Sequence, residues 1–209
     1  MAIQLLELQQ ADKLSACKIS LSLGVTSEQN LLEQFLQFNR NLMQANTALL
    51  VFHQEPYLWH RCPEKLKVID SSKITKSLNT LFVNDDLIDC KHPQYPTLLA
   101  FLASLKRKAQ TAIALQLRHP NQTALGYVIL FDEAAQEFTD LQKQLLQAHC
   151  VNFMQQLELK LNYDELKELY QQEAALNFSK TKFFSIISHD LRAPFHGLLG
   201  FSEILAKER

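Results

Sequence analysis

Glycine is scarce in this sequence, with only 4 among 209 residues. A loop that holds nucleotide phosphates needs glycines, because the backbone must approach the ligand closely. Neither a GxGxxG nor a GxxxxGK[ST] pattern occurs. The sequence therefore shows no ATP site of its own, and any reaction with ATP must use a nucleotide held by another domain.

Several other features are missing. No apolar run approaches the roughly 18 residues of a membrane span, and residues 1–13 lack the basic start of a signal peptide. The 4 cysteines form no CxxC pair and no dense framework, which favours a reducing cytoplasm. The net charge of -1 offers no basic field for nucleic acid.

The chain divides into a mixed region, up to about residue 140, and a region that is helical almost throughout. The mixed region predicts strands, a hairpin and helices in an α+β arrangement, in which an antiparallel sheet is flanked by helices. Ser27 is the expected N-cap of the second helix. The predicted helices cover residues 2–16, 27–46, 74–80 and 98–108, and the predicted strands cover 47–53, 57–62, 81–87, 109–118 and 124–131.

The stretches LFVNDDLIDCKHPQYP at 81–96 and LGYVILFDEAAQEFTDLQKQLLQAHC at 125–150 resemble the GAF domain family. The resemblance covers roughly residues 1–158. It implies a sensor domain that holds a small-molecule ligand between the sheet and the loop-rich segment 81–100. The ligand stays unknown, since the NKFDE-type signature of cyclic-nucleotide binders and a clear bilin-attachment cysteine are both absent.

Three cysteines stand near histidines in the sequence, as His60 and Cys62, Cys90 and His92, and His149 and Cys150. Residues i and i+2 of a strand share a face, so the first pair could offer two ligands together. Structural zinc needs four such ligands. We therefore expect no metal site and interpret these residues as packing and loop positions, with metal or covalent chromophore binding as the alternative.

Beyond residue 158, leucines recur at heptad spacing. This seam comprises Leu159, Leu166, Leu169, Leu176 and Phe183, with polar Asn162, Glu173 and Lys180 also on it. The pattern favours a parallel coiled coil between two chains, and polar seam residues help to specify its register. The alternative is one amphipathic helix that packs against its own domain.

A second apolar stripe begins at Phe184 and continues at Ile187, Leu191, Pro194, Leu198, Phe201 and Leu205. It is offset from the first seam, because Phe183 and Ile187 would occupy equivalent heptad positions four residues apart. Such an offset locally unwinds a supercoil. The junction could therefore hold two helix arrangements of similar energy, as a sensor requires.

Residues 182–205, KFFSIISHDLRAPFHGLLGFSEIL, closely resemble the H-box of histidine-kinase dimerisation and phosphoacceptor (HisKA) domains. The resemblance implies that His189 is phosphorylated by an ATP-binding domain and that Asp190 is its acidic partner. Arg192 lies at i+3 and is either a phosphoryl contact or a solvated charge. Pro194 removes the hydrogen bond to the carbonyl of Asp190 and would bend the helix at the phosphoacceptor.

Position 193 departs from the common pattern of the family, in which Thr or Asn positions a water for dephosphorylating the partner regulator. Ala193 has no hydrogen-bonding side chain, so we expect weak or absent phosphatase activity. With Ile187 on the seam, helical spacing places His189 on the outer, solvent-exposed side of the helix. His196 falls on the same side, where we interpret it as a surface residue.

These observations predict a GAF-like sensor domain (1–158), a signalling helix (159–182) and a truncated phosphoacceptor helix (183–209). The chain is expected to be a cytoplasmic, homodimeric part of a sensor histidine kinase that acts on a response regulator. ATP and Mg would bind in a missing catalytic domain, without which the fragment is expected to be inactive. The alternatives are a ligand-free dimerisation or docking module and a phosphotransfer protein phosphorylated in trans.

Overall fold

The structure is a computed structural model that describes residues 16–25, 30–70, 78, 80–82, 85–119 and 121–207, without the side chains of 201 and 203–207. Its elements follow one another as α2 (Lys18–Ser22), α3 (Leu31–Leu42), β1 (Thr47–Phe52), β2 (Tyr57–Arg61), β3 (Leu66–Asp70), β4 (Leu87–Ile88), α5 (Tyr95–Ser104), β5 (Thr111–Arg118), β6 (Ala124–Asp132) and α6 (Asp140–Lys207). The chain divides into two compact units, Met1–Leu161 and Asn162–Arg209.

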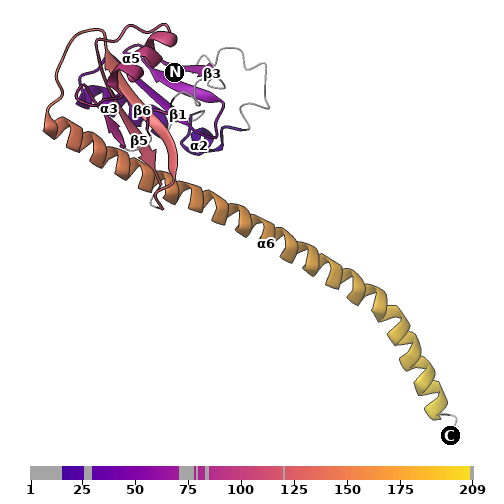
Figure 1. The fold of residues 1–209 in the computed structure, drawn as a ribbon. Coiled ribbons are helices and arrows are strands. Elements are labelled where there is room, and N and C mark those ends of the chain that lie inside the picture. Colours follow the sequence, from indigo (N-terminus) through magenta and orange to yellow (C-terminus); the bar gives the residue numbers. More distant parts are fainter. Residues whose placement is uncertain are drawn as a thin grey trace. The chain divides into compact units, whose positions relative to one another are not determined.

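A six-stranded antiparallel sheet in the order β3-β2-β1-β6-β5-β4 forms the centre of the first unit (Figure 1). The central strands are buried on both faces, which explains why β1 reads as a continuous apolar run rather than an alternating one. The longest pairing joins β5 and β6, which form the predicted hairpin. The α+β fold expected from the sequence is therefore confirmed.

The two faces of the sheet carry separate hydrophobic clusters. On one face, Leu50 and Leu130 pack with residues of α3 and of the first turns of α6. On the other face, Leu49 and Ile129 pack with residues of α5 and of the segment before β4. Neighbouring strand residues point to opposite faces, so each central strand contributes to both clusters.

Helix α3 begins later than the sequence predicted. Asn30 is its N-cap, and the Asn30 side chain accepts a hydrogen bond of 2.9 Å from the backbone amide of Glu33. The assignment of Ser27 as N-cap is therefore wrong, because the chain enters the helix three residues further on. Ser27 itself lies outside the described residues, as do residues 2–15 of the first predicted helix.

The segment before α5 also differs from the prediction. Leu81 and Phe82 lie in a turn and an irregular stretch, and among the described residues of this region the strand is Leu87–Ile88. Both side chains are buried in the second cluster, so their apolar character reflects anchoring rather than a strand. Helix α5 starts at Tyr95, three residues before the predicted start, with a proline in its first turn.

Two further differences concern segments that the prediction treated incompletely. Strand β3 was not predicted, although it pairs with β2 along its whole length. The predicted helix 74–80 lies almost entirely outside the described residues, where only Leu78 is assigned as helical.

Candidate functional site

The SHDLRAP motif, residues 188–194, lies on α6, which continues without interruption through Pro194. The His189 side chain is 85% exposed and that of Asp190 is 72% exposed. The Nδ1 atom of His189 lies 3.2 Å from Oδ1 of Asp190. Helical spacing alone argues against this contact, because adjacent residues of a helix do not face each other. The Asp190 carboxylate nevertheless reaches the ring.

In a neutral ring, this contact requires the proton to be on Nδ1, because an ionised carboxylate can only accept a hydrogen bond. When the Nδ1–H of His189 donates to the Asp190 carboxylate, Nε2 keeps its lone pair and faces away from that partner. A neutral imidazole in this tautomer is a competent nucleophile. Because both groups are largely exposed, the contact orients the ring but adds little to stability.

The neighbouring residues of the motif lie on the same exposed stretch of helix. Arg192, Ala193 and Pro194 are all solvent-accessible, as is His196. Pro194 cannot donate a backbone hydrogen bond, so the carbonyl of Asp190 loses its usual helical partner. The turn that carries His189 is thus the one weakened by the proline.

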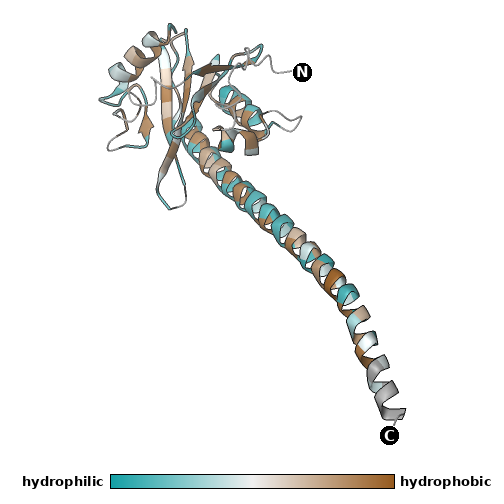
Figure 2. Cartoon of the chain, turned by 90° about the vertical axis from the view of Figure 1, so that its right-hand side faces the viewer, coloured by the Kyte–Doolittle hydropathy of each residue, from teal (hydrophilic) through white to brown (hydrophobic). Residues whose placement is uncertain are grey.

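Most of the large apolar residues that the structure describes on α6 beyond residue 158 are exposed within the single chain. Figure 2 shows hydrophobic positions recurring along this helix between hydrophilic ones. The exposed apolar side chains include Leu159, Leu166, Leu169, Leu176, Phe183, Phe184, Leu191 and Leu198. A long apolar stripe of this kind is typical of a helix that packs against a partner.

The cysteine–histidine neighbours have ordinary protein contacts. The Cys62 sulfur, directly after the end of β2, lies 3.5 Å from the His60 ring. The His92 ring contacts Asp85 at 3.0 Å, and the His149 ring contacts Asn39 at 2.8 Å. Within the described residues, no three His, Cys, Asp or Glu side chains gather closely enough to hold a metal ion.

On the sheet face where the sequence placed a ligand, several described aromatic side chains pack together. Tyr127 is buried there and stacks on Phe82, with 4.6 Å between ring centroids. The His53 ring packs on the same tyrosine at 4.7 Å. Burial lowers the pKa of His53 and raises that of Tyr127, so both groups are held in their neutral forms.

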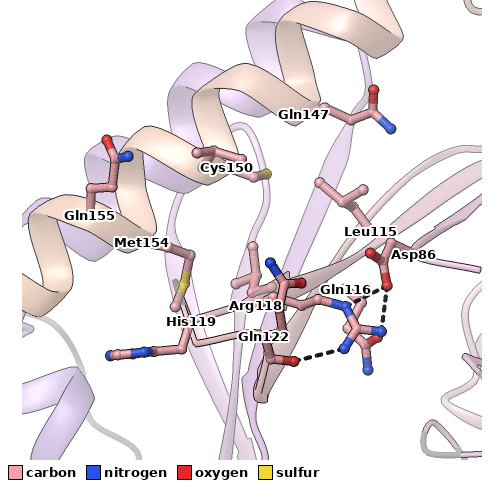
Figure 3. A pocket seen from close by; sticks show the side chains of 12 residues that line it. Asp86, Leu115, Gln116, Arg118, His119, Gln122, Gln147, Cys150, Met154 and Gln155 are labelled. Atoms are coloured by element: carbon pink, nitrogen blue, oxygen red, sulfur yellow. Dashed lines mark hydrogen bonds and ion pairs between the residues drawn. The ribbon is translucent and has the colours of Figure 1, made fainter.

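A cavity of about 380 Å³ lies on the opposite face, between β5 and α6. Figure 3 shows Cys150 and Met154 projecting from α6 above the end of β5, with Arg118 paired to Asp86 at the rim. No pattern in the sequence indicates this cavity, because its walls come from segments that are far apart along the chain. We refer to it below as the α6-side cavity.

The segment between β4 and α5 is tied to α6 by an ion pair. The Lys143 ammonium lies 2.6 Å from the Asp89 carboxylate, and the two side chains are only 13% and 15% exposed. A hydrogen bond and the positive charge of Lys143 hold the pKa of Asp89 below its ordinary value, although burial acts in the opposite direction. This pair connects the loop-rich side of the domain with the start of α6.

None of the described helices combines the length and apolar character needed to cross a lipid bilayer. No family model matches the sequence, and no curated protein matches it.

Solved structures do match. A bacteriophytochrome, RpBphP3 from R. palustris, is 9% identical with a TM-score of 0.52, over 75% of this chain and 40% of that one. The chain therefore spans less than half of that photoreceptor. The domain has a GAF-like α+β fold. The GAF domain of PixJ from Thermosynechococcus elongatus, in its blue-light-absorbing form, is 11% identical with a TM-score of 0.43, over 81% of this chain and 97% of that one.

Proposed function

We propose that the chain forms the sensory and phosphoacceptor parts of a two-component sensor histidine kinase. In this role the GAF-like domain receives a signal, α6 transmits it, and His189 accepts the γ-phosphoryl group of ATP. The response regulator then takes that group on an aspartate. ATP and Mg would be held by a catalytic domain, and the whole reaction would take place in the cytoplasm.

The observation that carries this proposal is the exposed His189 ring with Asp190 at its Nδ1 atom, inside the SHDLRAP motif. In the phosphotransfer step, Nε2 forms a bond to the γ-phosphorus as the bond from that phosphorus to the ADP oxygen breaks. The ring proton on Nδ1 faces a carboxylate that stabilises the positive charge developing on the imidazole. Asp190 thus acts as the positioning and charge-balancing partner.

Arg192 supports the proposal less directly. It follows His189 by three residues, so its side chain shares the same side of the helix. A guanidinium is suited to pairing with phosphoryl oxygens. Pro194 would allow the His189 turn to adopt different positions for the catalytic domain and for the regulator. Ala193 would leave the kinase with weak phosphatase activity, because no side chain there can hold the attacking water.

The exposed seam of α6 supports a symmetric parallel dimer. Leaving these apolar side chains in water would cost roughly 25 cal/mol for each Å² exposed. A second copy offers an identical seam, and closed two-fold symmetry is the commonest form of assembly. The chain is therefore proposed to act as a homodimer whose two α6 helices pair along their exposed stripes.

The seam can be continued in two registers. One uses Leu169 and Leu176 and reaches Ile187 with the four-residue offset described above. The other uses Tyr170 and Asn177 and reaches Phe184 without any offset. The first register is more apolar and the second is more regular, so the two compete. A signal could shift their balance only through a difference in its affinity for the two states.

Phosphotransfer to the intact chain tests the proposal. The full chain would be incubated with Mg-ATP and a panel of isolated histidine-kinase catalytic domains, and acid-labile phosphate would be mapped by mass spectrometry. We expect phosphate on His189, and we expect His189→Gln to abolish it. The control His196→Gln, on the same exposed helix, should be labelled like the wild type. Label on another residue, or none on a folded dimeric chain with any catalytic domain, would refute the assignment.

A ligand-free docking module is the second candidate. A solid domain core would favour it, whereas a cavity of ligand size favours a sensor. The α6-side cavity of about 380 Å³ therefore supports the sensory role.

A further inference from the structure

The α6-side cavity has the size and construction of a small-molecule site. Its volume of about 380 Å³ lies within the usual range of roughly 300–1,000 Å³ for ligand pockets. Leu115 and Leu117 of β5 form an apolar floor, and Cys150 and Met154 of α6 form the facing wall (Figure 3). Both sulfur-bearing side chains are almost fully buried, so this wall belongs to the packed core.

The charged groups around the cavity are already paired. Arg118 donates from Nε to Oδ1 of Asp86 at 2.7 Å and from Nη1 to the backbone carbonyl of Gln122 at 2.9 Å. The His119 ring lies 3.6 Å from a carboxylate oxygen of Glu158. A charged ligand would leave water without finding an unpaired opposite charge, and this desolvation is costly.

Amide groups, by contrast, are available at the rim. The side chains of Gln122, Gln147 and Gln155 line the cavity, and none of these amides makes a hydrogen bond within the described part of the chain. Each amide offers both donors and an acceptor. They match the adjacent N–H, ring nitrogen and C=O groups of a planar heterocycle. Thioether and thiol sulfurs also make favourable contacts with aromatic rings.

We propose that the α6-side cavity binds an uncharged nitrogen heterocycle of one or two rings, held between β5 and α6. The apolar floor and the two sulfurs would cover the faces of the ring, and the glutamine amides would read its polar edge. This site lies on the sheet face opposite to the loop-rich side.

Such a ligand would contact both the sheet and α6. It would therefore favour whichever packing of α6 against β5 gives the better fit. This regulatory consequence rests on the proposed function, because it assumes that α6 is the output of a sensor. The binding itself does not depend on that assumption, so the two can fail separately.

Methionine methyl NMR on the full chain tests the proposal. The sequence has 3 methionines, of which Met154 lines the cavity and Met43 is buried in the same cluster away from it. The chain, labelled at the methionine methyls, would be titrated with adenine and nicotinamide as uncharged probes. Benzoate and benzylamine would serve as charged probes of similar size. We expect a saturable shift of the Met154 resonance with an uncharged probe, and little change at Met43.

Two matched variants place the site. Val151→Phe adds bulk at an exposed position that lines the cavity, and should weaken probe binding by about tenfold or more. Leu145→Phe adds bulk at an exposed position of the same helix that does not line it, and should leave binding unchanged. The proposal is overturned if neither heterocycle shifts Met154, if the charged probes bind as well, or if both variants behave alike.

Discussion

The buried His60 gives a quantitative prediction about the stability of the GAF-like domain. Its ring is only 1% exposed, on β2 beside Leu49 of β1. Burial, with a smaller contribution from the charges of Arg107 and Lys67, lowers the pKa of His60 from 6.5 to about 4. One pKa unit corresponds to about 1.4 kcal/mol. Protonating this histidine in the folded state would therefore cost about 3 kcal/mol.

The sign follows from the direction of this change. Above pH 6.5 the His60 ring is neutral in both the folded and the unfolded chain. Its lowered pKa then takes nothing from the free energy of unfolding. As the pH falls from 6.5 towards 4, the unfolded chain takes up a proton that the folded chain refuses, and stability is lost. Glu55 acts in the opposite direction, because burial raises its pKa and the folded state binds its proton more tightly. The comparison must therefore be made between matched variants.

Urea unfolding of the wild type and of His60→Leu, from neutral to mildly acidic pH, measures this effect. His60→Leu should lose less stability on acidification than the wild type, by up to about 3 kcal/mol. Leu49→Val, at the paired position on β1, should lower stability equally at every pH. An unchanged pH dependence in His60→Leu would refute the reasoning.

Three further predictions concern the sheet, the link to α6 and the dimer. Gly126→Ala would drive a Cβ atom into the backbone oxygen of Val51, so β1 and β6 must separate. Thermal unfolding should show a loss of at least about 3 kcal/mol in the free energy of unfolding. Asp89→Asn removes the carboxylate that pairs with Lys143 of α6. Urea unfolding at neutral pH should show a loss of about 1–3 kcal/mol in the free energy of unfolding. No loss would show that the pair contributes nothing to stability. In a background without the accessible native cysteines, Leu176→Cys should form an interchain disulfide on mild oxidation, whereas Gln171→Cys, off the seam, should not. Equal cross-linking of both would contradict the parallel seam.

Four of the six strands, β1, β2, β5 and β6, could be predicted from the sequence because their signal is local. The apolar run at β1 and the hairpin of β5 and β6 were predicted within one or two residues. The segment around Leu81 and Phe82 was not, since large apolar residues have the same appearance in a buried strand and in a loop that anchors to a core. Only the tertiary packing distinguishes the two.

The candidate site divides in the same way. The exposure of His189 follows from helical spacing, whereas its contact with Asp190 depends on a side-chain conformation that spacing does not reveal. The α6-side cavity and the pair between Asp89 and Lys143 join residues that are tens of positions apart. Such groupings depend on the order of strands in the sheet, for which no local pattern exists.

The placement of these long-range contacts bears on how a signal could leave the domain. Near its start, α6 is held to the loop-rich side by the ion pair between Lys143 and Asp89. Further along, Glu158 of α6 contacts His119 of the β5–β6 hairpin. The α6-side cavity lies between these two attachments, with its wall formed by Cys150 and Met154. A packed helix fixed at two points has few ways to respond to a ligand between them. A ligand there would therefore shift α6 along its axis or rotate it. Helix α6 continues unbroken to the turn that carries His189. Under the proposed function, rotation is the motion that would exchange the two seam registers and so reach His189.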